Sequence, residues 1–110
     1  MNNARVLTGL HSLRNLFDRP GSHCRRMMAR GPHGRTHVGD PAATSFCLQG
    51  GVFRAVDEES RLFVIGALGK TLETRGARNT SLTAWNDTTG RNRQNVLDLI
   101  DATVARLQQG

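Results

Sequence analysis

Residues 82–87 read Leu-Thr-Ala-Trp-Asn-Asp, and Gly90-Arg91 follow after two threonines. The stretch contains the only Trp of the chain and leads directly into a segment with helical periodicity. Because residues 82–85 are short, contain Thr and are bounded by turn-forming residues, they are predicted to form a strand. Trp85 is expected to fill the core at the end of this strand, since Trp is highly buried on average.

The residues after Trp85 are typical of a turn. Asn86 and Asp87 are expected to make side-chain-to-backbone hydrogen bonds, and Asp87 can also pair with Arg91. Gly90 is expected to supply a backbone conformation with positive φ. The alternative is a binding platform, in which Trp85 stacks on a ligand and Asp87 acts as an acid or base.

Apolar periodicity predicts helices over residues 4–18, 41–56, 58–74 and 92–108. Asp40-Pro41 is a strong start signal for the second helix, with Asp as N-cap and Pro at the first helical position. The third helix is apolar around most of its circumference and is therefore expected to be mostly buried. Asn92 is the expected N-cap of the last helix.

The second predicted helix contains a Cys-x-x-Gly pattern, Cys47 to Gly50. Gly50-Gly51 lowers helix propensity by roughly 1 kcal/mol per Gly relative to Ala. That cost is understandable if another backbone packs closely against the helix there. Cys47 lies on the most apolar face, where Cys behaves as a small hydrophobic residue.

Residues 24–30 and 35–38 flank Gly31-Pro32-His33-Gly34 and are predicted to form a β-hairpin. The strand at 82–85 is expected to pair with this hairpin. The predicted fold is therefore a compact, helix-dominated α+β domain of four helices and a small antiparallel sheet, made of the hairpin and one short strand. At 110 residues the chain is long enough for one domain, spanning residues 1–110.

Positive charge is concentrated in the first half of the chain. Residues 1–54 carry eight Arg and two Asp, whereas residues 55–110 carry seven basic and seven acidic residues. Such asymmetry favours acidic or phosphate-bearing partners. The alternative is that the arginines are ordinary solvated surface residues, frequent only because the gene is rich in GC codons. No apolar run approaches the ~20 residues of a membrane span, and no signal peptide pattern is present, so a cytoplasmic location is expected. Two cysteines do not make a disulfide framework.

Several segments resemble a family of short, uncharacterised bacterial and phage proteins, known only as a domain of unknown function. The matching segments are residues 40–43, 46–55, 82–87, 90–91 and 96–100, and together they place the family-like part at about residues 22–108, after an N-terminal helix. The chain departs from the family pattern at Phe46, where Trp is usual, and at Asn92 and Asn95, where Thr and Glu are usual. The resemblance implies a fold and a bacterial or phage source but no function.

The predicted hairpin is the best functional candidate. Four arginines on it could contact phosphates or an acidic protein surface: Arg25, Arg26, Arg30 and Arg35. Trp85, Asn86, Asp87, Gly90, Arg91, Cys47 and Gly50 are assigned structural roles. A zinc site built from His23, Cys24, His33, His37 and Cys47 has the right ligand types but lacks a Cys-x-x-Cys pair. No metal and no cofactor is therefore expected.

Three functions remain open. The first is a non-enzymatic, phage- or prophage-borne binding protein that modulates a host protein or nucleoprotein through its basic face. The second is a nucleic-acid-binding module that uses the hairpin, although it has no interleaved aromatic residues for base stacking. The third, with the least support, is a small hydrolase built on Cys47 or Asp87. The sequence does not indicate the oligomeric state.

Overall fold

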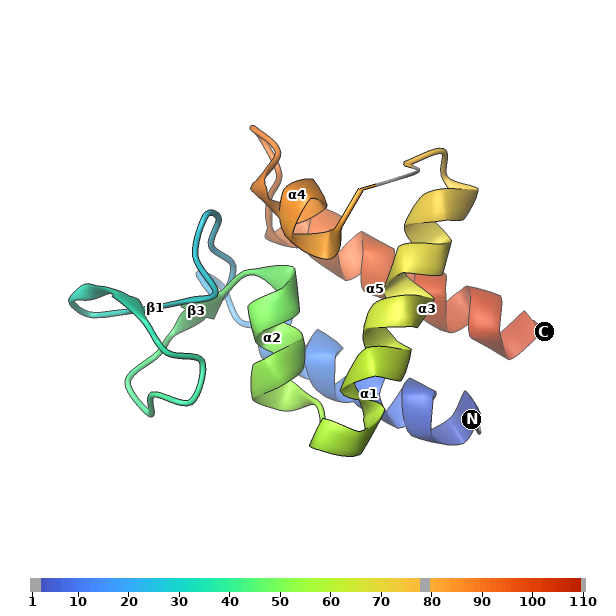
Figure 1. Ribbon diagram of the computed structural model, residues 1–110, viewed down its shortest axis with the longest axis horizontal. Helices are drawn as coiled ribbons and strands as arrows, with labels where there is room; N and C mark the ends of the chain where they lie inside the picture. The colour runs from blue at the N-terminus through green and yellow to red at the C-terminus, as the bar shows by residue number, and fades with distance from the viewer. Residues whose placement is uncertain (1–2, 78–79, 110) are drawn as a thin grey trace.

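A computed structural model of the chain describes residues 3–77 and 80–109. Helices make up most of the molecule, and a three-stranded sheet projects from one end of it, as Figure 1 shows. Both chain termini lie at the opposite end from the sheet. The predicted α+β class, a helix-dominated domain with a small antiparallel sheet, is confirmed.

Four helices of eight residues or more surround the core. They are α1 (Asn3–Phe17), α2 (Leu48–Ala55), α3 (Arg61–Thr74) and α5 (Arg93–Gln109). A 3-10 helix, η1 (Glu58–Ser60), precedes α3, and a short helix, α4 (Leu82–Asp87), lies between α3 and α5. None of the helices within the described ranges has the length and hydropathy that crossing a membrane requires.

The core is mainly aliphatic and lies where α1 meets α2, α3 and α5. Its largest fully buried side chains include Phe17, Leu13, Leu48, Leu99 and Ile100. The periodic stripe predicted on the first helix is the one that faces this core. Burial of such side chains contributes about 1.5–3 kcal/mol each, so this cluster is the main source of the fold's stability.

The sheet has the antiparallel order β2-β1-β3. Its strands are β1 (Ala29–Gly31), β2 (Gly34–Thr36) and β3 (Ser45–Phe46). The hairpin prediction is correct for its turn, but the first strand covers only 29–31 rather than 24–30. Residues 24–28 instead form a loop whose backbone groups bond to other parts of the molecule.

The helix predicted over 41–56 begins seven residues late. Residues 45–46 pair with β1, and Cys47 is the true N-cap of α2, its Sγ accepting from the Gly50 amide at 3.2 Å. Asp40 caps a turn, with Oδ1 accepting from the Ala42 amide at 2.9 Å. The local Asp-Pro signal is therefore real, but pairing with a distant strand prevents the turn from continuing as a helix.

The strand predicted over 82–85 is wrong, because these residues form the start of α4. Ser81 caps this helix, and its side-chain oxygen accepts from the Ala84 amide at 3.0 Å. Leu82 and Trp85, three residues apart, then point to the same buried side. The third strand of the sheet is 45–46 instead.

The expectation that the third helix is mostly buried is wrong on one face. Leu62 is 79% exposed and Phe63 is 49% exposed, at the N-terminal end of α3. The opposite face, with Val64, Leu68 and Leu72, is buried as expected. The helix is therefore apolar on both sides but covered on only one.

The last helix begins with a reciprocal capping arrangement. The Asn95 amide donates to Asn92 Oδ1 at 2.9 Å, and the Asn92 amide donates to Asn95 Oδ1 at 3.1 Å. This is the geometry of a capping box, in which two side chains satisfy each other's backbone groups. The two asparagines thus provide the same pair of bonds that Ser or Thr and Glu provide in the usual capping box.

An arginine-lined hollow as candidate functional site

Asn86 fixes the loop that carries the predicted arginines. Its side chain is completely buried, and its Nδ2 donates to the Cys24 carbonyl at 3.0 Å. Its Oδ1 accepts from the Leu48 amide at 3.0 Å, an amide at the start of α2 that has no partner within the helix. One side chain of α4 therefore joins the 22–28 loop to the N-terminus of α2.

His23 belongs to the same network. Its Nε2 lies 2.8 Å from Asn86 Oδ1. The amide orientation is set by the Leu48 donor and the Cys24 acceptor, so Nε2 must carry the proton and donate. Burial lowers the pKa of His23, Arg25 lowers it further, and the Asn86 hydrogen bond and Asp87 act in the opposite direction. The neutral form is therefore favoured.

Asp87 holds the next part of the loop. Its Oδ1 accepts from the Arg26 amide at 2.8 Å and from Asn86 Nδ2 at 3.1 Å. Arg26 has φ of 70°, and among the described residues it is the one non-glycine with positive φ. This conformation is uncommon for a residue with a Cβ, and the Asp87 contact stabilises it.

The expected pairing of Asp87 with Arg91 is wrong. Arg91 instead stacks on Trp85, with its guanidinium carbon 4.1 Å from the ring centroid, and its Nε donates to the Trp85 carbonyl at 2.9 Å. Gly90 has φ of 87°, as expected, and turns the chain so that Arg91 folds back. Trp85 is 8% exposed. It therefore packs in the core and supports the stacked Arg91 guanidinium, and its ring does not present an open face to a ligand.

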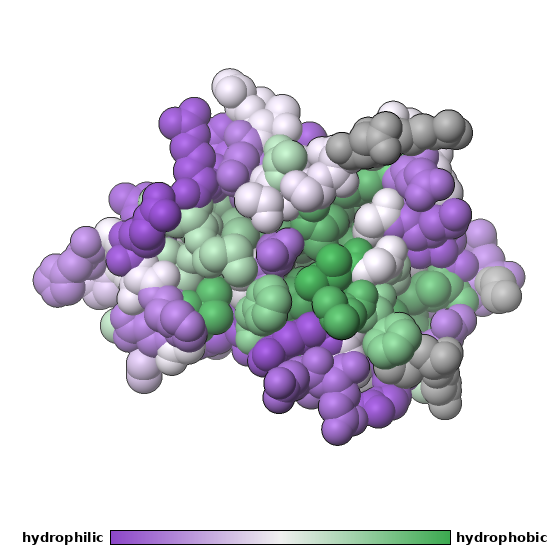
Figure 2. Space-filling view, viewed as in Figure 1, coloured by the Kyte–Doolittle hydropathy of each residue, from purple (hydrophilic) through white to green (hydrophobic). Residues whose placement is uncertain are grey.

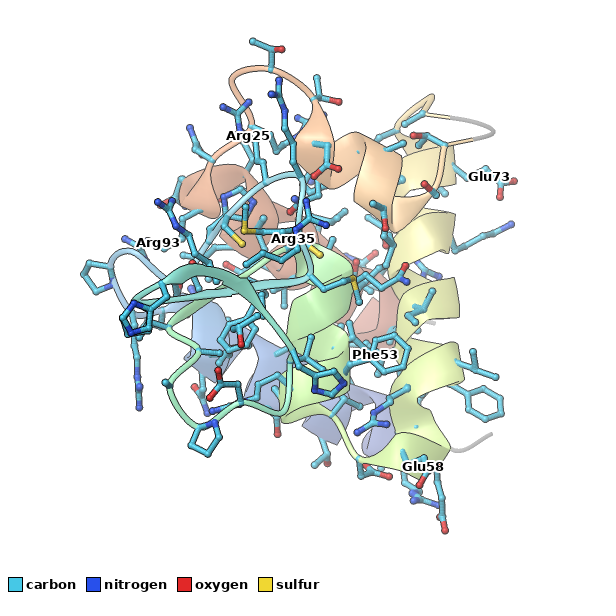
Figure 3. The ribbon with its side chains drawn as sticks, turned by 60° about the vertical axis from the view of Figure 1, so that its left-hand side comes forward. Arg25, Arg35, Phe53, Glu58, Glu73 and Arg93 are labelled. Atoms are coloured by element: carbon cyan, nitrogen blue, oxygen red, sulfur yellow. The ribbon has the colours of Figure 1, made fainter. Side chains whose placement is uncertain are left out.

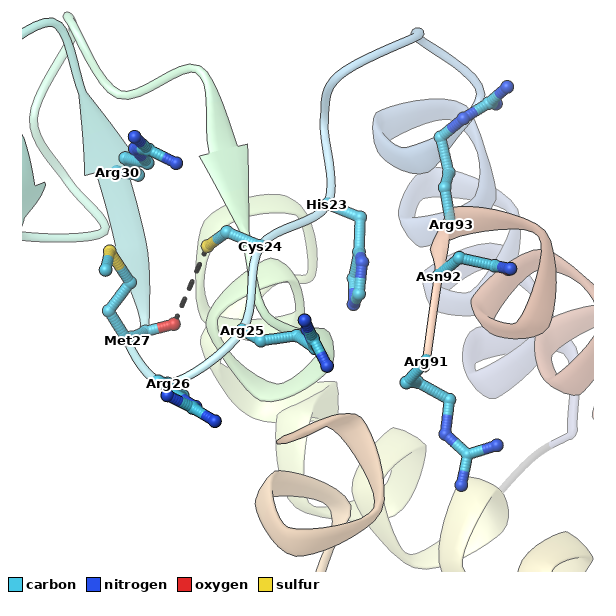
Figure 4. A pocket seen from close by; sticks show the side chains of 9 residues that line it. All are labelled: His23, Cys24, Arg25, Arg26, Met27, Arg30, Arg91, Asn92 and Arg93. Carbon is cyan, nitrogen blue, oxygen red and sulfur yellow. Dashed lines mark hydrogen bonds between the residues drawn. The ribbon is translucent and has the colours of Figure 1, made fainter. Parts of the chain in front are cut away.

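These contacts form one side of an open hollow of about 540 Å³. We call it the arginine hollow. Its lining residues are His23, Cys24, Arg25, Arg26, Met27, Arg30, Arg91, Asn92 and Arg93. Figure 4 shows the 23–30 segment on one side and the 91–93 segment on the other, with His23 and Arg25 between them.

Three of the four predicted arginines line this hollow: Arg25, Arg26 and Arg30. Arg25 reaches across to the α4–α5 loop, where its Nη1 donates to the Thr88 carbonyl at 3.2 Å. Arg35 does not line the hollow, but its Nη2 donates to the Arg26 carbonyl at 3.2 Å and so supports the loop from the other side.

Arg91 and Arg93 were missed as members of this site. They lie more than sixty residues beyond Arg30 in the sequence and reach the hollow only through the docking of α4 and α5. Arg93 Nη1 also donates to the Phe17 and Asp18 carbonyls at the end of α1. The Gly90-Arg91 pattern was visible in the sequence, but it indicated a turn rather than a charged surface.

The lining of the hollow contains no carboxylate. In the part of the chain that the structure describes, the ion pairs involve Arg5, Arg14 and Lys70, all on the helices away from the sheet. Figure 3 shows the same separation, with Arg25, Arg35 and Arg93 at the sheet end and Glu58 and Glu73 beside α3. Asp87, whose Oδ1 accepts from the Arg26 amide, lies close to the hollow and offsets only part of the charge of its five arginines.

The hairpin adds a second electrostatic feature. Arg30 and Arg35 are exposed and lie directly opposite each other in the β1–β2 register. Like charges at directly opposed positions destabilise a sheet. The repulsion between Arg30 and Arg35 therefore destabilises the β1–β2 hairpin in the unbound protein. An anionic partner would stabilise the hairpin by neutralising the pair.

A smaller hollow of about 390 Å³ is formed by β2, the residues beside it and α2. We call it the apolar hollow. Its lining residues are Met28, Arg35, Thr36, His37, Val38 and Phe53. Apart from Arg35 and His37 at the rim, it offers aliphatic, thioether and aromatic surface next to the basic surface.

The two cysteines are not activated. Burial raises the pKa of the Cys47 thiol, outweighing the backbone amide of Gly50 that acts in the opposite direction. Burial also raises the pKa of Cys24. Over residues 3–77 and 80–109, no three His, Cys, Asp or Glu side chains are grouped as metal ligands.

Gly50 permits a close approach between α2 and the loop. A Cβ at this position would overlap the carbonyl oxygen of Met28, whose other role is to accept from the Cys47 amide at 3.3 Å. The expected contact between backbones is thus present, and it fixes the far end of the 22–28 loop.

A family model for a family of unknown function, DUF6197, matches residues 1–106. The chain belongs to DUF6197. The matched residues include α1, the Cys47–Gly50 and Trp85–Arg91 segments and all residues that line the arginine hollow, and of the fold described above only the end of α5 lies beyond the DUF6197 match. No curated protein and no solved structure matches the chain.

Proposed function

We propose that this protein is a non-enzymatic binding protein that engages an acidic or phosphate-bearing macromolecular surface through the arginine hollow. One observation carries the proposal: five arginines converge on a hollow whose lining has no carboxylate. Guanidinium groups pair with carboxylates and phosphates through two parallel hydrogen bonds, which gives geometric as well as electrostatic selectivity.

Two unfavourable features of the loop and hairpin support a role of these arginines in binding. Arg26 is kept in a left-handed conformation, and Arg30 faces Arg35 across the hairpin. Both cost folding energy, and neither improves the packing of the core. Strain and charge repulsion of this kind are retained at sites that act on another molecule.

The apolar hollow favours an acidic protein over a nucleic acid as the partner. It lies beside the hairpin, and Arg35 is among its lining residues. Protein interfaces combine buried apolar anchors with a charged surround, whereas phosphate backbones offer no such anchor. We propose that the partner is a host protein or nucleoprotein, that the chain is of bacterial or phage origin, and that it acts in the cytoplasm.

A nucleic-acid-binding module is the second candidate. The exposed Arg30–Arg35 pair on a protruding ribbon and the net charge of +6 support it, since phosphate contacts supply most non-specific affinity. The only Trp lies beneath Arg91 and offers no open face for base stacking. A small hydrolase has the least support, because burial keeps the Cys47 thiol protonated.

A capture experiment distinguishes the two main candidates. The immobilised protein is exposed to bacterial lysate with and without nuclease, and the bound fraction is analysed for protein and nucleic acid. We expect protein to be retained after nuclease treatment and to be lost with Arg30→Glu. Arg19→Glu is the matched control, because Arg19 is also exposed but lies outside the arginine hollow. Retention of nucleic acid alone would favour the second candidate.

A further inference from the structure

The outward face of α3 is apolar and uncovered. Its exposed or partly exposed positions are Leu62, Phe63, Gly66, Gly69, Lys70 and Glu73. They lie opposite the buried positions Val64, Leu68, Thr71 and Leu72. Figure 2 shows apolar side chains gathered across the middle of the molecule in the region of α2 and α3, between hydrophilic regions.

The two glycines leave room for another molecule. A Cβ built on Gly66 or on Gly69 would meet nothing within 4 Å. Among the described residues, no contact therefore requires glycine at either position, although glycine lowers helix propensity. Close approach from outside is a physical reason to keep a helix surface this smooth.

The charged residues on this face can pair with those of a second copy of the same face. Glu58, just before α3, forms no ion pair in the described part of the chain, whereas Lys70 contacts only Glu73, at 3.8 Å. Glu58 thus lies on one side of the Leu62–Gly66 patch, and the Lys70–Glu73 pair lies on the other. In an antiparallel pairing, Glu58 of each copy would lie beside Lys70 of the other.

We propose that the outward face of α3 is a docking surface for a second copy of this chain. The register that aligns Glu58 with Lys70 also places residue 62 opposite residue 66. Leu62 of each copy then packs over Gly66 of the other, where there is open space for it. Charge and shape thus select the same antiparallel, two-fold arrangement, in which identical patches contact each other.

The dimer is expected to be weak and reversible. One helix face is small compared with the interfaces of permanent dimers, which bury well over about 2,000 Å². The α3 face lies on a different side of the molecule from the arginine hollow, as Figure 3 shows by the positions of Glu58 and Glu73 relative to Arg25 and Arg93. Dimer formation is therefore independent of the proposed binding function.

Sedimentation velocity over about 1 µM to 1 mM protein tests this proposal. The wild-type chain should shift from monomer to dimer, and Gly66→Arg should raise the dissociation constant at least about tenfold. Because a side chain at this position meets no described residue of the protomer and Arg has a higher helix propensity than Gly, Gly66→Arg should keep or slightly raise the melting temperature. Ala105→Arg, an exposed position on α5, is the matched control and should dimerise normally.

A charge exchange tests the register. Glu58→Lys and Lys70→Glu should each weaken self-association, because each homodimer would then contain two like-charged contacts. A mixture of the two variants should recover dimers, since both contacts become attractive in the mixed pair. A wild-type chain that stays monomeric throughout, or association indifferent to Gly66→Arg, would overturn the proposal. Failure of the mixture to recover dimers would overturn the antiparallel register.

Discussion

Asn86→Ala should be among the most destabilising single substitutions in this protein. The Asn86 side chain is completely buried and makes four hydrogen bonds: to the Leu48 amide, the Cys24 carbonyl, His23 and Asp87. Alanine would leave the Leu48 amide and the Cys24 carbonyl without partners. Each buried polar group left unsatisfied costs about 1–3 kcal/mol, so the expected loss for the two groups is about 2–6 kcal/mol.

This loss is a large fraction of the total stability. A domain of this size has a free energy of unfolding of about 5–15 kcal/mol, so the variant would retain only part of it. Urea titration followed by Trp85 fluorescence measures the difference. Asn15→Ala, at an exposed position on α1, is the matched control and should change stability by less than about 0.5 kcal/mol. A loss below about 1 kcal/mol for Asn86→Ala would refute the argument that this side chain joins the loop to α2.

Trp85→Ala should destabilise the protein by about 3–5 kcal/mol in a chemical denaturation experiment monitored by circular dichroism, because a large buried aromatic is deleted. Unchanged stability with loss of binding would instead make Trp85 a ligand platform. Arg26→Gly should raise the melting temperature slightly, since glycine accepts φ of 70° without a Cβ penalty, while binding weakens. Lower stability would contradict the strain assigned to Arg26. Burial lowers the pKa of His23, so the unfolded chain takes up the proton first as the pH falls. The free energy of unfolding should therefore decline from about pH 7 to pH 5, and the decline should be shallower in His23→Gln.

The helical part of the fold follows from the sequence because its signal is periodic. The apolar stripes of α1 and α5 repeat over several turns, so the prediction of these two helices did not depend on any one residue. The glycine pair of α2 was also informative, because its cost implied a close backbone contact, here with Met28. Such features are local or repeated, and local reasoning can recover them.

The errors arise where pairing with distant residues decides between local alternatives. Asp40-Pro41 is compatible with a helix start, but residues 45–46 pair with Ala29 and Arg30 instead. A six-residue segment such as α4 is too short for periodicity to separate a helix from a strand. The sequence contains no local sign of the partner that settles either case.

The candidate site was also predicted only in the part that local sequence determines. The run of charge at Arg25, Arg26 and Arg30 predicted a basic surface, and these side chains line one hollow. Arg91 and Arg93 complete it from a segment that is distant in the chain. Their contribution depends on Asn86 and Asp87, which dock the loop against α4. No feature of composition or spacing could indicate that contact.

The most direct test of the proposed function is the salt dependence of partner binding in the wild-type chain and in Arg26→Glu. The captured partner is titrated against each protein from about 50 to 300 mM salt, with Arg19→Glu as the control of equal net charge. If the arginine hollow is the binding surface, wild-type affinity should fall steadily as salt rises. Arg26→Glu should bind at least about tenfold more weakly at low salt with an unchanged melting temperature, and Arg19→Glu should resemble the wild type. Equal affinities for Arg26→Glu and Arg19→Glu, or binding indifferent to salt, would contradict the proposal.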